Sequence, residues 1–256
     1  MIRHAFLSFV TAILILVPFL GFAHPVVEPD DPDVLREALL EHRFEEAASK
    51  AERAKAWVEK AIPPTANQLL WDVKHYHLEL SLDPDIRILT GEVTVTAEVV
   101  SDAISTLDLD LKSNMTVTGA WSDGQATGFT RPTNRVTVTL DRVYGTGETV
   151  NVKVAYSGNP AGGAFGWDSR SGQDMIWTLS EPFGARDWWP CKDLNTDKAD
   201  SVDIEVTVPD HLVVASQGLL VDQFSGGGVS NYHWKSNYPI PTYLVSLAIH
   251  PYTQYS

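Results

Sequence analysis

The segment from Glu181 to Asp200, EPFGARDWWPCKDLNTDKAD, holds the residues of this sequence that could most readily do chemistry. It places a carboxylate, two adjacent tryptophans and the only cysteine of the chain in one stretch. Pro182 and Pro190 restrict the backbone, and Gly184 permits conformations that other residues avoid. A loop that is held in one shape and presents an acid beside large aromatic rings is typical of the wall of a binding site.

Glu181 is the candidate binding residue of this loop. It follows the strand-like run DMIWTLS and precedes Pro182, so we expect it at the end of a strand, where side chains commonly face a ligand. Trp188 and Trp189 are expected to exclude water from it. A carboxylate that is partly removed from water binds an ammonium group more strongly than a solvated one. A glutamate that is simply on the surface or caps a helix is the alternative interpretation.

The remaining polar residues of the loop are interpreted as structural. Cys191 is alone, so it cannot form an internal disulfide, and no histidine near it in sequence could activate the thiol. We therefore expect a buried, unreactive cysteine. The charged residues form a set that could pair internally and hold the shape of the loop: Arg186, Asp187, Lys192, Asp193, Asp197, Lys198 and Asp200.

Histidines and serines elsewhere form no recognisable catalytic or metal-binding pattern. His75 and His77 share one face of an expected strand, which could be half of a zinc site, but no third ligand occurs at a matching spacing. We interpret them as histidines of a polar strand face. Ser180 and Ser216 have no adjacent base, and the sequence contains no phosphate loop and no Cys-x-x-Cys pair. The sequence thus predicts no catalytic residue and no metal ligand in this chain.

The composition argues against nucleic acid as a partner and indicates an exported protein. The 256 residues carry a formal net charge of −14, which would repel a polyanion and attract a cationic group. Arg3 precedes a long apolar stretch, and Gly21 and Ala23 occupy the small-residue positions of a cleavage site before His24. Residues 1–23 are predicted to be a signal peptide, with the protein periplasmic or secreted; an uncleaved membrane anchor is the alternative.

Two regions of different periodicity follow the predicted signal peptide. Residues 24–66 are predicted to contain an acidic, proline-rich leader and a short amphipathic helix. From Trp71 onward, apolar residues recur at every second position, which is the spacing of half-buried strands. Residues 67–256 are therefore predicted to form an all-β domain, an antiparallel sandwich or saddle. The alternating runs include residues 76–82, 93–99, 107–111, 136–140, 150–156 and 202–208.

Three blocks of this β-region, taken in order, resemble one protein family. The central block is TLSEPFGARDWWPCKDLNTDKADSVDIEVTVP, with YHLELSLDPDIRILTGEVTVTAEV before it and WKSNYPIPTYLVSLAIHPY after it. Together they resemble the N-terminal β-domain of the gluzincin zinc aminopeptidases, the family of aminopeptidase N and leukotriene hydrolase. The resemblance covers the chain from Asn67 to its C-terminus.

The resemblance implies a role for Glu181 that agrees with its chemistry. In that family the acid at this strand end binds the free α-amino group of the substrate, and Glu181 stands at the matching position. Many members carry a glutamine two residues earlier, lining the pocket for the first side chain, whereas this sequence has Leu179. The implied partners are a peptide with a free N-terminus and a catalytic zinc domain.

The zinc-binding half of the family's site does not occur in these residues. Neither His-Glu-x-x-His nor Gly-x-Met-x-Asn is present, and the resemblance places the start of the catalytic domain just beyond Ser256. Zinc is therefore implied for that domain and not for this chain. We expect the N-terminal, substrate-anchoring domain of an exported zinc aminopeptidase, which removes N-terminal residues from peptides only when a catalytic zinc domain completes it.

Two other functions remain open at this point. A free-standing exported β-sandwich could bind carbohydrate or peptide, with Trp167, Trp177, Trp188 and Trp189 as stacking platforms. A non-catalytic interaction domain would instead present an unusually apolar face to another protein.

Overall fold

The computed structural model describes residues 36, 40, 41, 43–45 and 62–253. The predicted signal peptide, residues 1–23, and most of the predicted leader and helix lie outside the described residues. Within the predicted helix, the residues that are described are helical. No helix among the described residues is long and apolar enough to cross a membrane. The β-structure lies within one compact unit, Trp57–Ser256.

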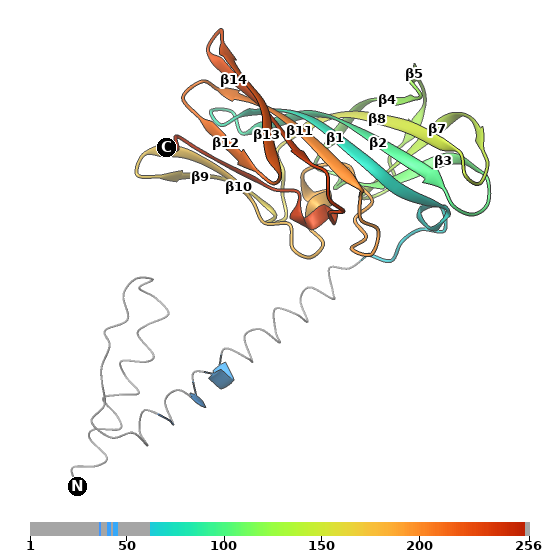
Figure 1. Ribbon diagram of the computed structural model, residues 1–256, viewed down its shortest axis with the longest axis horizontal. Helices are drawn as coiled ribbons and strands as arrows, with labels where there is room; N and C mark the ends of the chain where they lie inside the picture. The colour runs from blue at the N-terminus through green and yellow to red at the C-terminus, as the bar shows by residue number, and fades with distance from the viewer. Residues whose placement is uncertain (1–35, 37–39, 42, 46–61, 254–256) are drawn as a thin grey trace. The chain divides into compact units, whose positions relative to one another are not determined.

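Alternation of apolar and polar residues produces the strands that the sequence predicts, and the largest sheet contains eight of them (Figure 1). Their spatial order is β13-β14-β11-β1-β2-β8-β4-β5. Every second residue from Tyr76 to Leu82 in β1 is buried, so one face of this sheet covers the core and the other carries polar side chains. The strands are β1 (Trp71–Asp83), β2 (Ile88–Val99), β4 (Thr116–Ser122), β5 (Gln125–Ala126), β8 (Thr149–Gly158), β11 (Ser201–Pro209), β13 (Leu219–Gly226) and β14 (Val229–Ser236).

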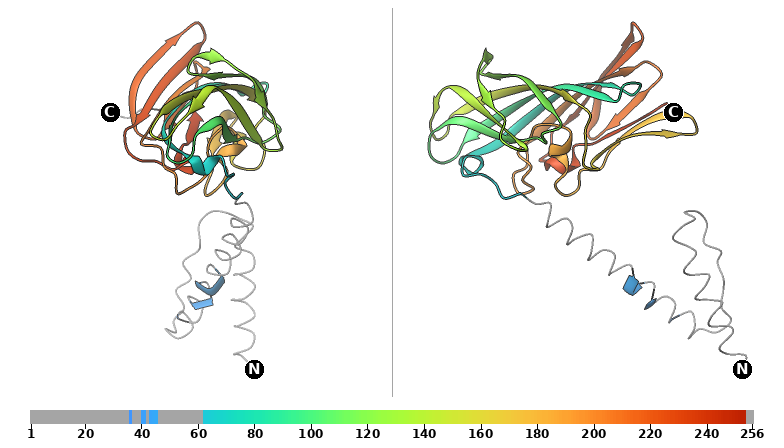
Figure 2. Two further views of the ribbon diagram at one scale, coloured as in Figure 1. Left: turned by 90° about the vertical axis from the view of Figure 1, so that its right-hand side faces the viewer. Right: turned by 180° about the vertical axis from the view of Figure 1, so that it is seen from behind.

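Two smaller sheets lie toward opposite ends of the large one (Figure 2). The four-stranded sheet has the order β12-β15-β10-β9, and the three-stranded sheet has the order β3-β7-β6. Their strands are β3 (Ile104–Asp110), β6 (Phe129–Thr130), β7 (Arg135–Tyr144), β9 (Phe165–Arg170), β10 (Gln173–Thr178), β12 (Val213–Ser216) and β15 (Leu247–His250). The fold is all-β, as predicted.

Buried side chains from all three sheets form one apolar cluster. Leu78 of the large sheet, Leu109 of the three-stranded sheet and Ile176 of the four-stranded sheet all belong to it. Removing apolar surface from water stabilises a fold by about 25 cal/mol per Å². This cluster therefore supplies the main free energy that holds the sheets together.

One strand pair of the large sheet differs from the antiparallel prediction. β1 and β11 run parallel, with His75 opposite Ser201 and Ser81 opposite Thr207. The two strands are separated by residues 84–200, and a pattern of alternation contains no information on the direction in which such distant strands meet. The large sheet is therefore mixed, because β1 also pairs with β2 in the antiparallel direction.

Residues 179–200 join β10 to β11, and we call this segment the connector. It contains the 3₁₀ helix η3 (Ala185–Asp187), and residues 185–193 are all buried. Most connections run over the surface because their backbone groups need water, so a buried connector must satisfy its polar groups internally. Two further 3₁₀ helices, η2 (Gln68–Leu70) and η4 (Thr242–Leu244), lie outside it.

Candidate functional site

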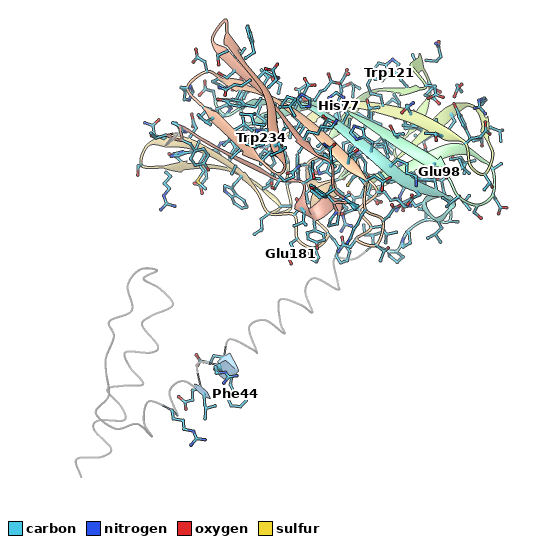
Figure 3. All side chains as sticks on the ribbon, viewed as in Figure 1. Phe44, His77, Glu98, Trp121, Glu181 and Trp234 are labelled. Carbon is cyan, nitrogen blue, oxygen red and sulfur yellow. The ribbon has the colours of Figure 1, made fainter. Side chains whose placement is uncertain are left out.

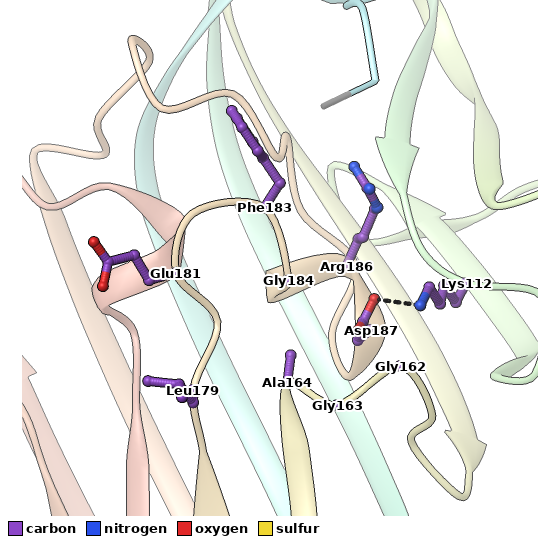
Figure 4. A pocket seen from close by; sticks show the side chains of 10 residues that line it. All are labelled: Lys112, Gly162, Gly163, Ala164, Leu179, Glu181, Phe183, Gly184, Arg186 and Asp187. Atoms are coloured by element: carbon purple, nitrogen blue, oxygen red, sulfur yellow. Dashed lines mark ion pairs between the residues drawn. The ribbon is translucent and has the colours of Figure 1, made fainter. Parts of the chain in front are cut away.

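Glu181 lies just beyond the end of β10, in the first part of the connector (Figure 3). Its side chain is exposed and forms no hydrogen bond or ion pair with any described residue. Figure 4 shows its carboxylate turned away from the Lys112–Asp187 ion pair. An exposed carboxylate without a partner is available to a cationic ligand.

Glu181 borders a cavity of about 100 Å³. Three segments form its walls: the connector, Lys112 after β3, and the glycine-rich turn around Gly162 and Gly163 after β8. Sequence patterns do not single out Lys112. The glycine pair is a usable signal, because adjacent glycines allow the backbone to approach another group closely.

Backbone hydrogen bonds hold the turn that carries Glu181. The Leu179 N–H donates to the Ala164 carbonyl at 2.8 Å, and the Gly184 N–H donates to the Ser180 carbonyl at 2.7 Å. A Cβ on Gly184 would lie only 2.6 Å from the Ala164 Cβ, so this approach requires glycine. The turn is therefore tight, and it is tied to the start of β9.

Trp188 and Trp189 do not shield Glu181 from water, contrary to the sequence prediction. Both are 0% exposed, whereas Glu181 is exposed. The Trp189 ring meets Tyr76 edge-on at 4.9 Å, and the Trp188 ring lies 6.1 Å from Phe165. Large rings gain most by leaving water completely, so the two tryptophans pack into the core beneath the turn.

The carbohydrate-binding alternative loses two of the four rings on which it depends. Trp188 and Trp189 are inaccessible and cannot stack on a sugar. Trp167 and Trp177 are half-buried, and the indole N–H of Trp167 donates to Asn159 Oδ1 at 3.0 Å. No observation on the described residues favours this function.

Most of the charged residues that are predicted to hold the shape of the connector form ion pairs, and we call this set of residues the charge lattice. The Lys192 ammonium also donates to the Trp71 carbonyl at 2.5 Å, which ties the connector to the start of β1. Lys198 and Asp200 are exposed and form no ion pair with other described residues, so that part of the prediction is wrong. The pairs observed are Lys112–Asp187 at 2.9 Å, Arg186–Asp193 at 3.7 Å and Lys192–Asp197.

Cys191 and the two strand histidines have structural environments. Cys191 is fully buried, and this burial raises the pKa of its thiol well above the ordinary value, as expected for an unreactive cysteine. His75 Nδ1 hydrogen-bonds with Ser201 Oγ at 2.8 Å, and His77 Nε2 lies 3.1 Å from Glu205 Oε1. In the part of the chain that the structure describes, no three histidine, cysteine, aspartate or glutamate side chains are placed to hold a metal.

Comparison with known proteins identifies the family. Residues 72–244 match the model of the peptidase M1 N-terminal domain. The chain belongs to this family. The match agrees with the resemblance found in the three sequence blocks, and it includes all of β1 but its first residue, the connector and β14.

Solved and curated relatives of this M1 N-terminal domain are longer than the chain. The crystal structure of an M1 zinc metallopeptidase from Deinococcus radiodurans has a TM-score of 0.66 and 32% identity, covering 74% of this chain and 44% of that one. A variant of that enzyme was solved bound to a Tyr-Ser-Ala substrate. Leukotriene A-4 hydrolase of Xenopus laevis is 25% identical over 193 residues, and leucine aminopeptidase 2 of Pyricularia oryzae is 27% identical over 205. The chain spans 31% and 32% of these two proteins.

The zinc that these relatives imply does not fit the residues of this M1 N-terminal domain. The described residues offer no metal-binding group, and the sequence lacks His-Glu-x-x-His. The chemistry available at the site is that of an unpaired carboxylate in a fixed turn.

Gly162 lies so close to the Lys112–Asp187 pair that a Cβ there would overlap both charged groups. Gly163 is the matched control, because a Cβ there would meet nothing within 4 Å. We expect Gly162→Ala to lower the free energy of unfolding by about 3 kcal/mol, through backbone strain and a broken partly buried pair. Gly163→Ala should cost only about 1 kcal/mol, the strain of its positive φ. Urea denaturation measures both, and equal losses would contradict the expectation.

Asp193 makes the stability of the fold depend on pH. Burial raises the pKa of its carboxyl to about 6, although Arg186 and the Thr242 hydroxyl favour the charged form. The folded pKa is above the unfolded one, so this group stabilises the fold at low pH, and the contribution is lost as the pH rises through about 6. When the pH rises from about 4.5 to about 7.5, the free energy of unfolding of Asp193→Asn should therefore increase by about 2 kcal/mol relative to that of the wild type.

Urea denaturation of both proteins at the two pH values measures this gain. A difference between wild type and Asp193→Asn that does not change with pH would show that the carboxyl titrates normally.

Proposed function

We propose that the chain is the N-terminal, substrate-anchoring part of an exported M1 zinc aminopeptidase, in which Glu181 binds the free α-amino group of a peptide. A catalytic zinc domain completes the site and removes the N-terminal residue. The observation that carries the proposal is the exposed, unpaired Glu181 carboxylate on a turn that is tied to a buried connector.

The chemistry of Glu181 fits an ammonium group. A carboxylate accepts charge-assisted hydrogen bonds, and an α-ammonium supplies up to three donors. Lys112, a cation on the wall of the same cavity, is already paired with Asp187. An incoming ammonium therefore does not have to displace an internal partner from Glu181.

Exposed apolar side chains at the same end of β10 support a covering domain. The Leu247 N–H donates to Thr178 Oγ1 at 2.8 Å, which places the start of β15 beside the end of β10, and η4 ends three residues before Leu247. Leu179 is 65% exposed and Leu244 of η4 is 51% exposed. Large apolar side chains gathered near a candidate site are typical of a surface that another domain covers. The D. radiodurans metallopeptidase, of which this chain covers 44%, has the additional length for such a domain.

The sequence supports export and a cationic class of ligand. The apolar segment of residues 1–23 supports a periplasmic or secreted protein. The net charge of −14 favours cationic ligands over nucleic acid.

Replacing Glu181 tests the anchor in a complete enzyme. In a hybrid in which residues 67–253 replace the matching domain of the D. radiodurans peptidase, Glu181→Gln should lower kcat/KM for Tyr-Ser-Ala about 100-fold. This is the scale for losing one partner of a desolvated charge pair. Steady-state kinetics of tyrosine release measures it.

Glu79→Gln is the matched control, because Glu79 is also exposed and forms no ion pair with described residues, but it lies on the polar face of β1. Its kcat/KM should equal that of the unmodified hybrid. If Glu181→Gln were as active as Glu79→Gln, the anchor role would be wrong.

The 256-residue chain alone is expected to have no aminopeptidase activity, with or without added zinc. The reason is that neither His-Glu-x-x-His nor a described metal-binding group is present to activate water. Release of the aniline from an aminoacyl anilide measures this. Chelator-sensitive hydrolysis in a preparation free of other peptidases would overturn the expectation.

A further inference from the structure

We propose that Trp188 is a positioning residue for Glu181, acting through a buried hydrogen bond from its indole N–H to the hydroxyl of Ser180. The inference rests on the proposed function, because it concerns the carboxylate that binds the substrate's ammonium group. It gives one core tryptophan a role that packing alone would not require.

Ser180 and Trp188 satisfy each other inside the domain. Ser180 is 3% exposed, and Trp188 is 0% exposed. Trp188 Nε1 donates to Ser180 Oγ at 3.0 Å. Water does not reach this pair, so removing either partner leaves the other with an unmet polar group. The indole N–H and the hydroxyl therefore depend on each other for this hydrogen bond.

Ser180 precedes Glu181 directly, so its position sets the point from which the carboxylate projects. The backbone bonds Leu179–Ala164 and Ser180–Gly184 shape the turn itself. The bond between hydroxyl and indole joins this turn to Trp188 of the apolar core. Loss of that contact leaves the turn shaped but less firmly held.

Trp188 is a firm anchor because aromatic rings surround it. Its ring centroid lies 5.9 Å from that of Trp189 and 6.1 Å from that of Phe165. Trp189 in turn meets Tyr76, a buried residue of β1. A side chain packed at core density does not shift freely, so it can fix a neighbour that must meet a ligand in one geometry. A carboxylate held in place in advance binds more tightly, because binding does not have to order it.

Trp189 supplies a matched control. It is adjacent to Trp188 and also 0% exposed, but its indole N–H has no hydrogen-bond partner within the described residues. Phenylalanine at either position replaces a buried indole by a smaller ring. Only Trp188→Phe also removes a hydrogen bond to the turn that carries Glu181.

The first test is ¹⁵N relaxation on the full 256-residue chain. We expect the order parameter of the Glu181 N–H to fall from about 0.85 to about 0.6 in Ser180→Ala and in Trp188→Phe, and to remain unchanged in Trp189→Phe. The double variant should be no looser than either single variant, because both changes remove the same bond. If Trp188→Phe does not fold, Ser180→Ala carries the test, because it removes only one hydroxyl.

The second test introduces the same substitutions into the hybrid enzyme and measures binding of Tyr-Ser-Ala, from KM, and of its N-acetylated form, from competitive inhibition. Ser180→Ala and Trp188→Phe should weaken binding of the free-amino peptide about fivefold, the scale of one hydrogen bond, and leave the acetylated peptide unaffected. A general loss of structure would instead weaken both peptides together.

A Glu181 N–H that stays rigid in both Ser180→Ala and Trp188→Phe would overturn the positioning role, as would equal loosening in Trp189→Phe. The proposed function fails by a different measurement, namely an unchanged kcat/KM for Tyr-Ser-Ala after Glu181→Gln in the hybrid enzyme. The two failures are therefore distinguishable.

Discussion

The connector crosses the interior of the domain with charged side chains, and the site depends on these charges being paired. A buried ion is tolerated only when a partner and hydrogen bonds replace the water it has lost. Lys192 meets this requirement with Asp197 and with the Trp71 carbonyl. The pair with Asp197 lies within the connector, whereas the bond to the Trp71 carbonyl joins the connector to β1. Together they hold the connector on one path, so Glu181 reaches the surface at one place. The charged residues buried in the connector are Arg186, Asp187, Lys192 and Asp193.

In this domain, the free energy of folding and the selection of one path for the connector have different sources. Buried ion pairs contribute little net stability, because desolvation offsets their attraction, whereas apolar burial contributes throughout the core. The charge lattice therefore selects the path of the connector, and the rings of Trp188 and Trp189 supply free energy beneath it. Glu181 takes no part in either task, since it is exposed and without a partner among the described residues. Unlike Asp200, which is also exposed and forms no ion pair with other described residues, Glu181 borders the cavity and is placed to meet a ligand.

The fold could be predicted further than the site. Alternation from Tyr76 to Leu82 identifies a strand and its buried face, because one face of a sheet meets the core and the other meets water. The same pattern cannot show that β1 and β11 are parallel. Likewise, Leu219 and Phe224 resemble half-buried strand residues in sequence, yet β13 is an edge strand exposed along its whole length. The resemblance of the three blocks identified the family, while the expectation that Trp188 and Trp189 exclude water from Glu181 was wrong, because connector residues close in sequence can lie at very different depths.

The exposure of Glu181 itself argues for a second domain in the proposed function. Two unit charges about 4 Å apart attract by about 1 kcal/mol in water but by about 4 kcal/mol where the effective dielectric constant is near 20. As the domain stands, Glu181 is in the first environment, so it would hold a peptide's ammonium only weakly. A domain that rests on Leu179 and Leu244 would exclude water from the carboxylate and move it toward the second environment. On this view the domain supplies a charge fixed in place, and the surface that covers it makes that charge an effective anchor.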